Sequence, residues 1–127
     1  MATKQLFPDG TEVAAFYVRA LRSGPLVFVS GTTSLDAKGG VRGKDAARQT
    51  AITMAKIAAA LKAAGARIGN LTRLTIFVTD IRDMAAVSKA LGKALKGSAV
   101  SSTLVAVTAL AVPGLLVEIE ATAVVEA

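Results

Sequence analysis

The sequence contains no cysteine and no histidine among its 127 residues. These absences exclude a thiolate nucleophile, an imidazole base and a zinc site of the usual kind. No run of 18 or more apolar residues occurs, so no membrane span is expected. Any catalysis would have to use carboxylates, hydroxyls, the single tyrosine, arginine, lysine or backbone groups.

Aromatic residues are scarce, because the chain has only four Phe and one Tyr. The net charge is +6, from fifteen Lys and Arg against nine Asp and Glu. A basic balance is compatible with nucleic-acid binding, but the cations are scattered from Lys4 to Lys96 and few aromatic side chains are available for base stacking. We therefore expect an ordinary solvated basic surface, and nucleic acid is not an expected partner.

Hydrophobic residues make up 53% of the chain, which is high for a small protein. The length fits one domain, residues 1–127, with a modest core. The first ten residues have no apolar stretch typical of a signal peptide, which favours a cytoplasmic protein. Since the apolar content exceeds what one small core needs, we expect a symmetric homo-oligomer.

Alternating and continuous apolar patterns predict five strands. Two lie within 15–31 and turn at Ser23-Gly24-Pro25, and the others cover about 71–80, 101–110 and 115–125. On the last of these, Glu118 and Glu120 are two residues apart in an apolar run, so both carboxylates should point to one face of the sheet. Burying two acids side by side is costly, which raises the question of an accompanying cation.

Two helices are predicted between these strands. The first runs from the N-cap Asp45 to about 64, before Gly65. Its apolar stripe is Ala47, Thr50, Ala51, Met54, Ile57, Ala58 and Leu61, with Arg48, Gln49, Lys56 and Lys62 outside it. The many alanines suggest close packing against a sheet. The second begins near 83 and ends at Gly97. It is expected to bury Met84, Val87, Leu91 and Leu95 and to expose Lys89, Lys93 and Lys96.

The resulting order ββ-α-β-α-ββ predicts an α+β sandwich, with one sheet and both helices on one of its faces. The other face still carries apolar residues such as Phe77. We expect that face to pack against other subunits.

Several strings in this order resemble the RidA family, also called YjgF or L-PSP. They are "YVRALRSGPLVFVSG", "QTAITMAKIAAALKAAGA", "GNLTRLTIFVTDIRDMAAV" and "VEIEATAV". The resemblance runs from about 17 to 124. It implies a chorismate-mutase-like fold with a mixed sheet, assembled as a homotrimer with small-molecule clefts between subunits. It also implies hydrolysis of reactive enamines and imines, with no metal and no cofactor.

The resemblance also implies site residues. Tyr17, Ser30 and Gly31 match cleft positions that bind substrate, and Glu118 matches the acid that orients water. No role is carried over to Glu120. Without the resemblance, the sequence favours reading Glu118 as an acid at a strand edge, exposed to solvent or paired with a cation, and the match to the family motif reverses this preference.

The chain departs from the family in "AVSSTLVAV". Active members carry Pro-x-Arg-Ser here, and the arginine binds the substrate carboxylate. In this chain Ser102 takes the place of that arginine, and Thr103 follows it in the segment that is expected to bind substrate. The cleft position that follows is Leu104. Ser102 offers only a neutral hydrogen bond, so a native ligand is expected to be less anionic than an amino-acid-derived imine.

Three functions follow from this pattern. The first is a trimeric metabolite-binding protein with weak or absent imine deaminase activity. The second is a deaminase in which Arg19, Arg22 or Arg73 replaces the missing cation. The third is RNA binding or ribonuclease activity, which the net charge permits but the lack of histidine and of a basic–aromatic stripe disfavours.

Overall fold

The computed structural model describes residues 3–126 of the chain, which form one six-stranded sheet and two helices. The strands are β1 (Gln5–Phe7), β2 (Ala20–Ser23), β3 (Leu26–Thr32), β4 (Leu71–Val78), β5 (Ser101–Ala106) and β6 (Val117–Val124). The helices are α1 (Ala46–Ala63) and α2 (Met84–Leu95), with short 3-10 turns η1 (Ile68–Asn70) and η2 (Ile81–Asp83). Neither α-helix is long and apolar enough to cross a membrane.

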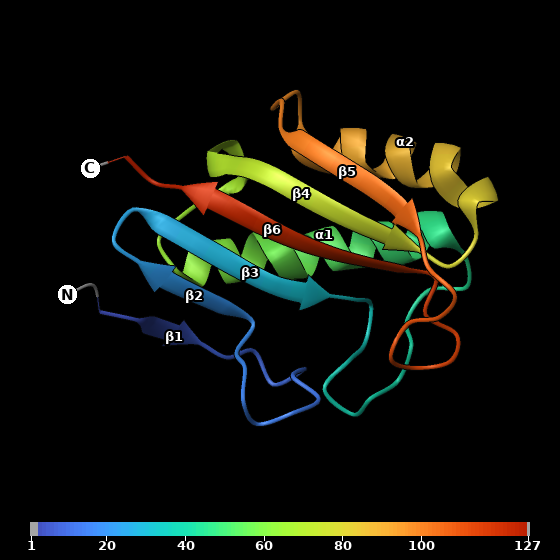
Figure 1. Ribbon diagram of the computed structural model, residues 1–127, viewed down its shortest axis with the longest axis horizontal. Coiled ribbons are helices and arrows are strands. Elements are labelled where there is room, and N and C mark those ends of the chain that lie inside the picture. Colours follow the sequence, from blue (N-terminus) through green and yellow to red (C-terminus); the bar gives the residue numbers. More distant parts are fainter. Residues whose placement is uncertain (1–2, 127) are drawn as a thin grey trace.

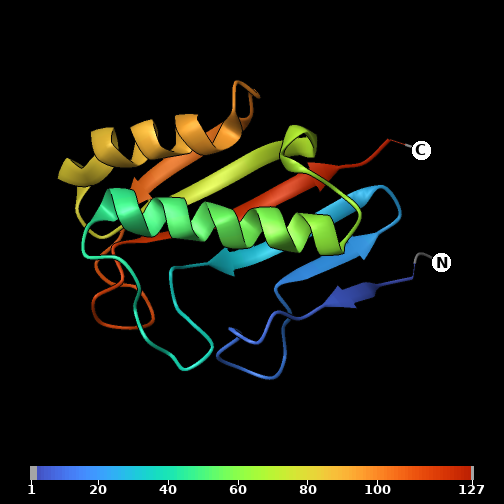
Figure 2. The ribbon, with the colours of Figure 1, turned by 180° about the vertical axis from the view of Figure 1, so that it is seen from behind.

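The strands follow the spatial order β1-β2-β3-β6-β4-β5. Strands β4 and β5 are parallel, and the other neighbouring pairs are antiparallel. Both helices cover the same face of the sheet, as the two opposite views show (Figures 1 and 2). The predicted α+β sandwich with its two helices on one face is therefore confirmed.

One strand was not predicted. Strand β1 spans three residues and is mostly exposed at the edge of the sheet. Such a short segment carries no alternation of buried and exposed residues that a pattern could detect.

Helix α1 begins and ends as predicted. The Asp45 carboxylate accepts a hydrogen bond of 2.7 Å from the backbone N–H of Arg48, and Gly65 follows the helix with a φ of +82°. The predicted facing of several α1 residues was wrong. Gln49 is buried, Lys56 is partly buried through contacts with the loop after β3, and Ala51 is exposed.

Helix α2 buries Val87 and Leu91 and exposes Lys89 and Lys93, with exposed Lys96 just after its end, as predicted, whereas Leu95 is only partly buried. Met84 was expected in the core but is 49% exposed. It occupies the first turn of α2, which extends beyond the ends of the strands (Figures 1 and 2). The periodicity is correct, but no sheet lies beneath that turn.

The core lies between the sheet and the helices. Along β6 it is lined by the alternate residues Val117, Ile119, Ala121 and Ala123, all of them buried. We call the opposite face of the sheet, which no helix covers, the open face. Several large apolar side chains on it are 38–43% exposed: Leu26, Phe28, Val105 and Val124.

Candidate functional site

Glu118 and Glu120 lie on the open face, as their spacing predicted. In the register of the sheet, Glu118 pairs with Phe77 and Glu120 pairs with Thr75. Glu118 is partly buried, whereas Glu120 is exposed. Gly31 of the neighbouring strand approaches Glu118 so closely that a Cβ atom at this position would collide with the carboxylate. Because Gly31 has no side chain, the Glu118 carboxylate can occupy the space beside it.

The surroundings of Glu118 favour its protonated form. Burial is the largest cause and raises the pKa of the carboxyl group above its ordinary value of 4.5. The positive charge of Arg19 acts in the opposite direction, and the negative charge of Glu120 adds to the effect of burial. A carboxyl group with a raised pKa is common where a side chain exchanges protons with a ligand.

The raised pKa of Glu118 leads to a pH-dependent stability. The folded chain binds a proton at Glu118 more tightly than the unfolded chain does, so protonation of Glu118 stabilises the folded state. This stabilisation is fully present below pH 4.5 and is lost as the pH rises through the raised pKa of Glu118 in the folded state. Glu118→Gln should therefore unfold at higher urea concentration than the wild type at pH 7 and at the same concentration near pH 3. Urea titrations from pH 3 to 8, with Glu120→Gln as control, measure this. A difference that stays constant with pH would contradict it.

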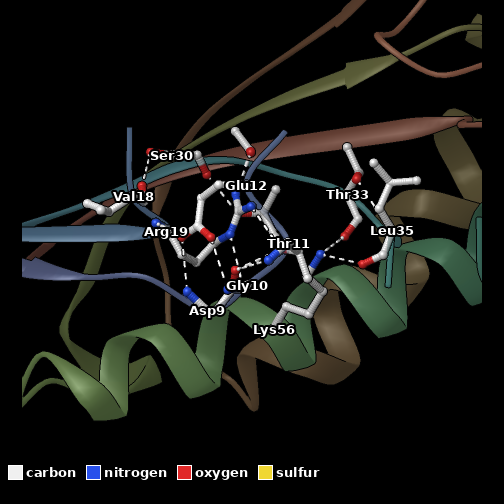
Figure 3. Close-up of polar contacts among 12 residues, drawn as sticks. Asp9, Gly10, Thr11, Glu12, Val18, Arg19, Ser30, Thr33, Leu35 and Lys56 are labelled. Carbon is white, nitrogen blue, oxygen red and sulfur yellow. Dashed lines mark hydrogen bonds and ion pairs between the residues drawn. The ribbon is translucent and has the colours of Figure 1, made fainter. Parts of the chain in front are cut away.

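The cation near Glu118 is Arg19, which is only 3% exposed. Its Nη1 donates hydrogen bonds to the Gly31 carbonyl at 2.8 Å and to Thr32 Oγ1 at 3.2 Å. Its Nε forms a 3.2 Å ion pair with Asp9, and its Nη2 donates to Thr11 Oγ1 at 2.9 Å. Figure 3 shows this guanidinium at the centre of a polar network between the N-terminal loop and β3. The Arg19 side chain therefore serves to hold these segments of the fold together.

The same network orders the loop before β2 and the end of β3. The Glu12 carboxylate accepts hydrogen bonds from the backbone N–H groups of Asp9, Gly10 and Arg19. Ser30 Oγ donates to the Val18 carbonyl at 2.7 Å (Figure 3). These contacts fix the segment that carries Tyr17 against the strand that carries Ser30.

Lys56 holds the loop that follows β3. Its Nζ donates to the carbonyls of Thr33 and Leu35, both at 2.8 Å (Figure 3). Burial, followed by the charge of Arg19, lowers the pKa of the Lys56 ammonium group. The sequence pattern placed this lysine outside the apolar stripe of α1, but a long side chain can bury its stem and carry its charge to backbone acceptors.

A pocket of about 840 Å³ lies on the open face beside these residues. Its lining brings together Tyr17 and Ser30 from the predicted site with Arg73 and Glu120, two charged side chains of opposite sign. Three of the five aromatic side chains also line it: Phe16, Tyr17 and Phe28. Glu118 lies two residues before Glu120 on β6, and Gly31 follows Ser30 on β3, but neither is part of the lining. We call this the open-face pocket.

The segment of β5 that carries Ser102 and Thr103 lies across the sheet from Tyr17. Ser102 pairs with Leu74, whose side chain is buried under the helices, so Ser102 points to the helix-covered face. Thr103 pairs with Thr75 and shares the open face with Glu120. Within one chain, therefore, the residue at the position of the family's arginine does not face Glu118, and neither β5 residue lines the open-face pocket.

Three arginines were candidates for the missing cation, and the structure separates them. Arg19 is buried in its network, and Arg22 donates to the carbonyls of Gly24 and Ala64 at the end of α1. Arg73 is exposed, lines the open-face pocket and belongs to neither of the two ion pairs found in residues 3–126. Arg73 is the arginine available to a ligand.

Sequence reasoning assigned no role to Glu120, Phe16 or Lys4, which also line this pocket. Alternation placed Glu120 on the correct face, but nothing in the sequence indicated that β6 inserts between β3 and β4. For metal binding, residues 3–126 contain no suitable group of three or more Asp and Glu side chains.

Comparisons with known proteins bear on the family and the fold. The model of the protein family described as "Endoribonuclease L-PSP" matches residues 9–125. A 2-iminobutanoate/2-iminopropanoate deaminase from Salmonella typhimurium is 32% identical over 72 residues, which is 57% of this chain and 56% of the enzyme. The match thus spans little more than half of that relative.

Solved structures are similar over nearly the whole chain. A Mycobacterium tuberculosis member of the YjgF/YER057c/UK114 family has a TM-score of 0.85 and 41% identity, covering 97% of this chain and 100% of that one. A Thermotoga maritima protein described as a putative endoribonuclease has a TM-score of 0.89 at 23% identity, covering 98% and 100%, and shows the shared fold alone. The chain therefore belongs to the RidA family, also named YjgF and L-PSP.

Proposed function

We propose that the chain binds a small metabolite in the open-face pocket and hydrolyses imines of the 2-aminoacrylate type weakly or not at all. The observation that carries this proposal is the lining of the pocket, where Tyr17 and Ser30 lie together with Arg73. The second half rests on Ser102, which stands where active relatives carry an arginine. Losing such a charge-assisted contact costs about 2–5 kcal/mol, or roughly one and a half to three and a half decades in rate.

We further propose that copies of the chain complete the site by packing on the open face as a homotrimer. The resemblance to the family implies this assembly, with clefts between subunits. Exposed Leu26, Phe28 and Val105 support it, because a second copy over this face would remove apolar surface from water. The same contact would cover the open side of the pocket and exclude water from a bound ligand.

A second candidate is an imine deaminase with a relocated cation. Arg73 favours it, since this guanidinium is free to bind a carboxylate bidentately beside Tyr17 and Ser30. Glu118 would orient a water molecule that adds to the imine carbon. The C–N bond then breaks, ammonia leaves and a keto group remains. A ribonuclease activity is not proposed, because the chain has no histidine for acid–base cleavage of RNA.

One experiment distinguishes the two candidates. The purified protein and the Salmonella relative are each assayed with 2-aminoacrylate, which a pyridoxal-phosphate-dependent dehydratase generates in situ. The rate of keto-acid formation is measured. We expect the protein to be about a hundredfold slower than the relative, within the lower half of the loss estimated for the missing arginine. Arg73→Met and Glu118→Gln should then leave this residual rate unchanged, whereas Arg73→Met should weaken binding of 2-oxobutanoate observed by NMR.

Arg42→Met serves as the matched control, because Arg42 is exposed and lies outside the open-face pocket. A wild-type rate equal to that of the relative would overturn the first candidate. If Arg73→Met and Glu118→Gln then each lost two decades, the relocated-cation deaminase would replace it. The sedimenting mass of the same samples tests the assembly, and a monomer at micromolar concentration would contradict the trimer.

A further inference from the structure

A second hollow lies on the opposite side of the molecule, between the two helices. Helices α1 and α2 lie side by side over the sheet and run in the same direction (Figure 2). The hollow between them has a volume of about 770 Å³. We call it the interhelical groove. It is separate from the open-face pocket and is used by neither candidate function.

Alanines create the interhelical groove. Its floor carries four alanines from α1 and three from α2: Ala47, Ala51, Ala55, Ala58, Ala86, Ala90 and Ala94. Their side chains are too short to fill the space above the line where the helices meet, and buried Met54 lies at the bottom. Larger apolar residues at these positions would close the hollow. The apolar surface is therefore recessed between two walls.

Cations line the walls of the groove. They are Arg48 on α1, Lys89 and Lys93 on α2, and Lys96 at the C-terminal end of α2. None of them takes part in the two ion pairs of residues 3–126. Asp45 is the one acid in the lining, and its carboxylate already caps α1. Neither helix contains a single Asp or Glu within its bounds. The helical layer thus presents unneutralised positive charge around an apolar channel.

We propose that the interhelical groove docks an acidic amphipathic helix from a partner protein. At a rise of about 1.5 Å per residue, the stretch from Ala86 to Lys96 is about 15 Å long, or roughly three helical turns. A ridge of large apolar side chains at i, i+3, i+4 and i+7 fits a recessed floor of alanines. Lys89, Lys93 and Lys96 have the i, i+4, i+7 spacing that would face Glu or Asp along one side of such a helix.

The same observations disfavour other occupants. A second copy of this chain would bring helices that lack acids, and like charges would meet. A flat lipid surface would reach the lysines but not the recessed floor. Nucleic acid would use the charge but leave the apolar floor unused, and no aromatic side chain lines the groove for base stacking. Only a ligand that is apolar along one ridge and acidic beside it uses both features.

A designed peptide tests the proposal. The probe is a fluorescein-labelled 16-residue helix with leucines along one ridge and glutamates on its flanks. A scrambled peptide of the same composition has no amphipathic face. With the full chain, we expect saturable binding of the first peptide by fluorescence anisotropy, and at least tenfold weaker binding of the second. Backbone NMR shifts should be confined to α1, α2 and the residues between them that line the groove.

Variants of the chain complete the test. Lys89→Glu with Lys93→Glu should weaken binding about tenfold by reversing two wall charges, and Ala90→Leu should weaken it by filling the groove. Lys62→Glu and Ala63→Leu are matched controls on exposed α1 positions outside the groove and should bind as the wild type does. Equal binding of the scrambled peptide, no binding at all, or shifts on the open face would overturn the proposal. So would stronger binding to anionic vesicles or RNA than to the peptide.

Discussion

Arg19→Met is expected to lower the free energy of unfolding by about 3 kcal/mol or more. Arg19 is 3% exposed and joins Asp9 to the Gly31 carbonyl and the Thr32 hydroxyl. Methionine fills much of the same volume but leaves those acceptors without their donor, including a partly buried carboxylate. A buried acceptor deprived of its partner keeps its full cost of desolvation. The effect should therefore far exceed that of losing an exposed ion pair.

Urea unfolding at pH 7 measures the loss, with Arg42→Met as the exposed control, which should change stability by no more than about 0.5 kcal/mol. Arg19→Lys should lie between the two, because it keeps the charge but not the planar fork of donors. A loss below 1 kcal/mol in Arg19→Met would contradict the role assigned to the network. A second readout is the pKa of Glu118, which should rise further when the nearby positive charge is removed.

Gln49→Leu is expected to cost about 3 kcal/mol for a different reason. The Gln49 side chain is 1% exposed and crosses from α1 to two loops. Its Nε2 donates to the carbonyls of Gly43 and Gly114, and its Oε1 accepts a 2.8 Å hydrogen bond from the Leu116 N–H. Leucine would leave three backbone groups unpaired, at about 1–3 kcal/mol for each that water cannot reach. The carbonyls of Gly43 and Gly114 lie nearer the surface than the Leu116 N–H. The expected loss of stability is therefore well below the summed cost of three fully buried groups.

The other glutamine of the chain provides the comparison. Gln5 lies exposed on β1, and Gln5→Leu should change stability by less than about 0.5 kcal/mol. The free energy of unfolding from urea titration tests both variants. If Gln49→Leu were as stable as the wild type, the bridge between α1 and the segment before β6 would contribute nothing net.

Local patterns in the sequence were sufficient for the two helices, for five of the six strands and for the placement of the two acids. The alternation in β6 predicted that Glu118 and Glu120 share a face, and they do. Caps at Asp45 and Gly65 marked α1 because they satisfy its terminal backbone groups locally. Strand β1 escaped prediction because three residues carry no period.

Long side chains were harder to predict, because their partners are distant in sequence. Gln49 and Lys56 were both predicted to lie outside the apolar stripe of α1. Gln49 pairs with residues 65 and 67 positions away, and Lys56 pairs with carbonyls more than 20 positions away. Helical periodicity predicts only which side of a helix packs on its neighbouring surface. It contains no information on acceptors that are so distant in sequence.

The sequence by itself determined the family, the α+β architecture and the absence of an arginine at position 102. Only the tertiary structure decided which arginine is available. It locked Arg19 into the N-terminal loop and Arg22 onto α1, and it left Arg73 in the open-face pocket with Tyr17 and Ser30. It also separated Ser102 from the face that carries Glu118. The physical reason is that a charge's role depends on which acceptors surround it, and in this chain those acceptors come from strands and loops that only folding brings together.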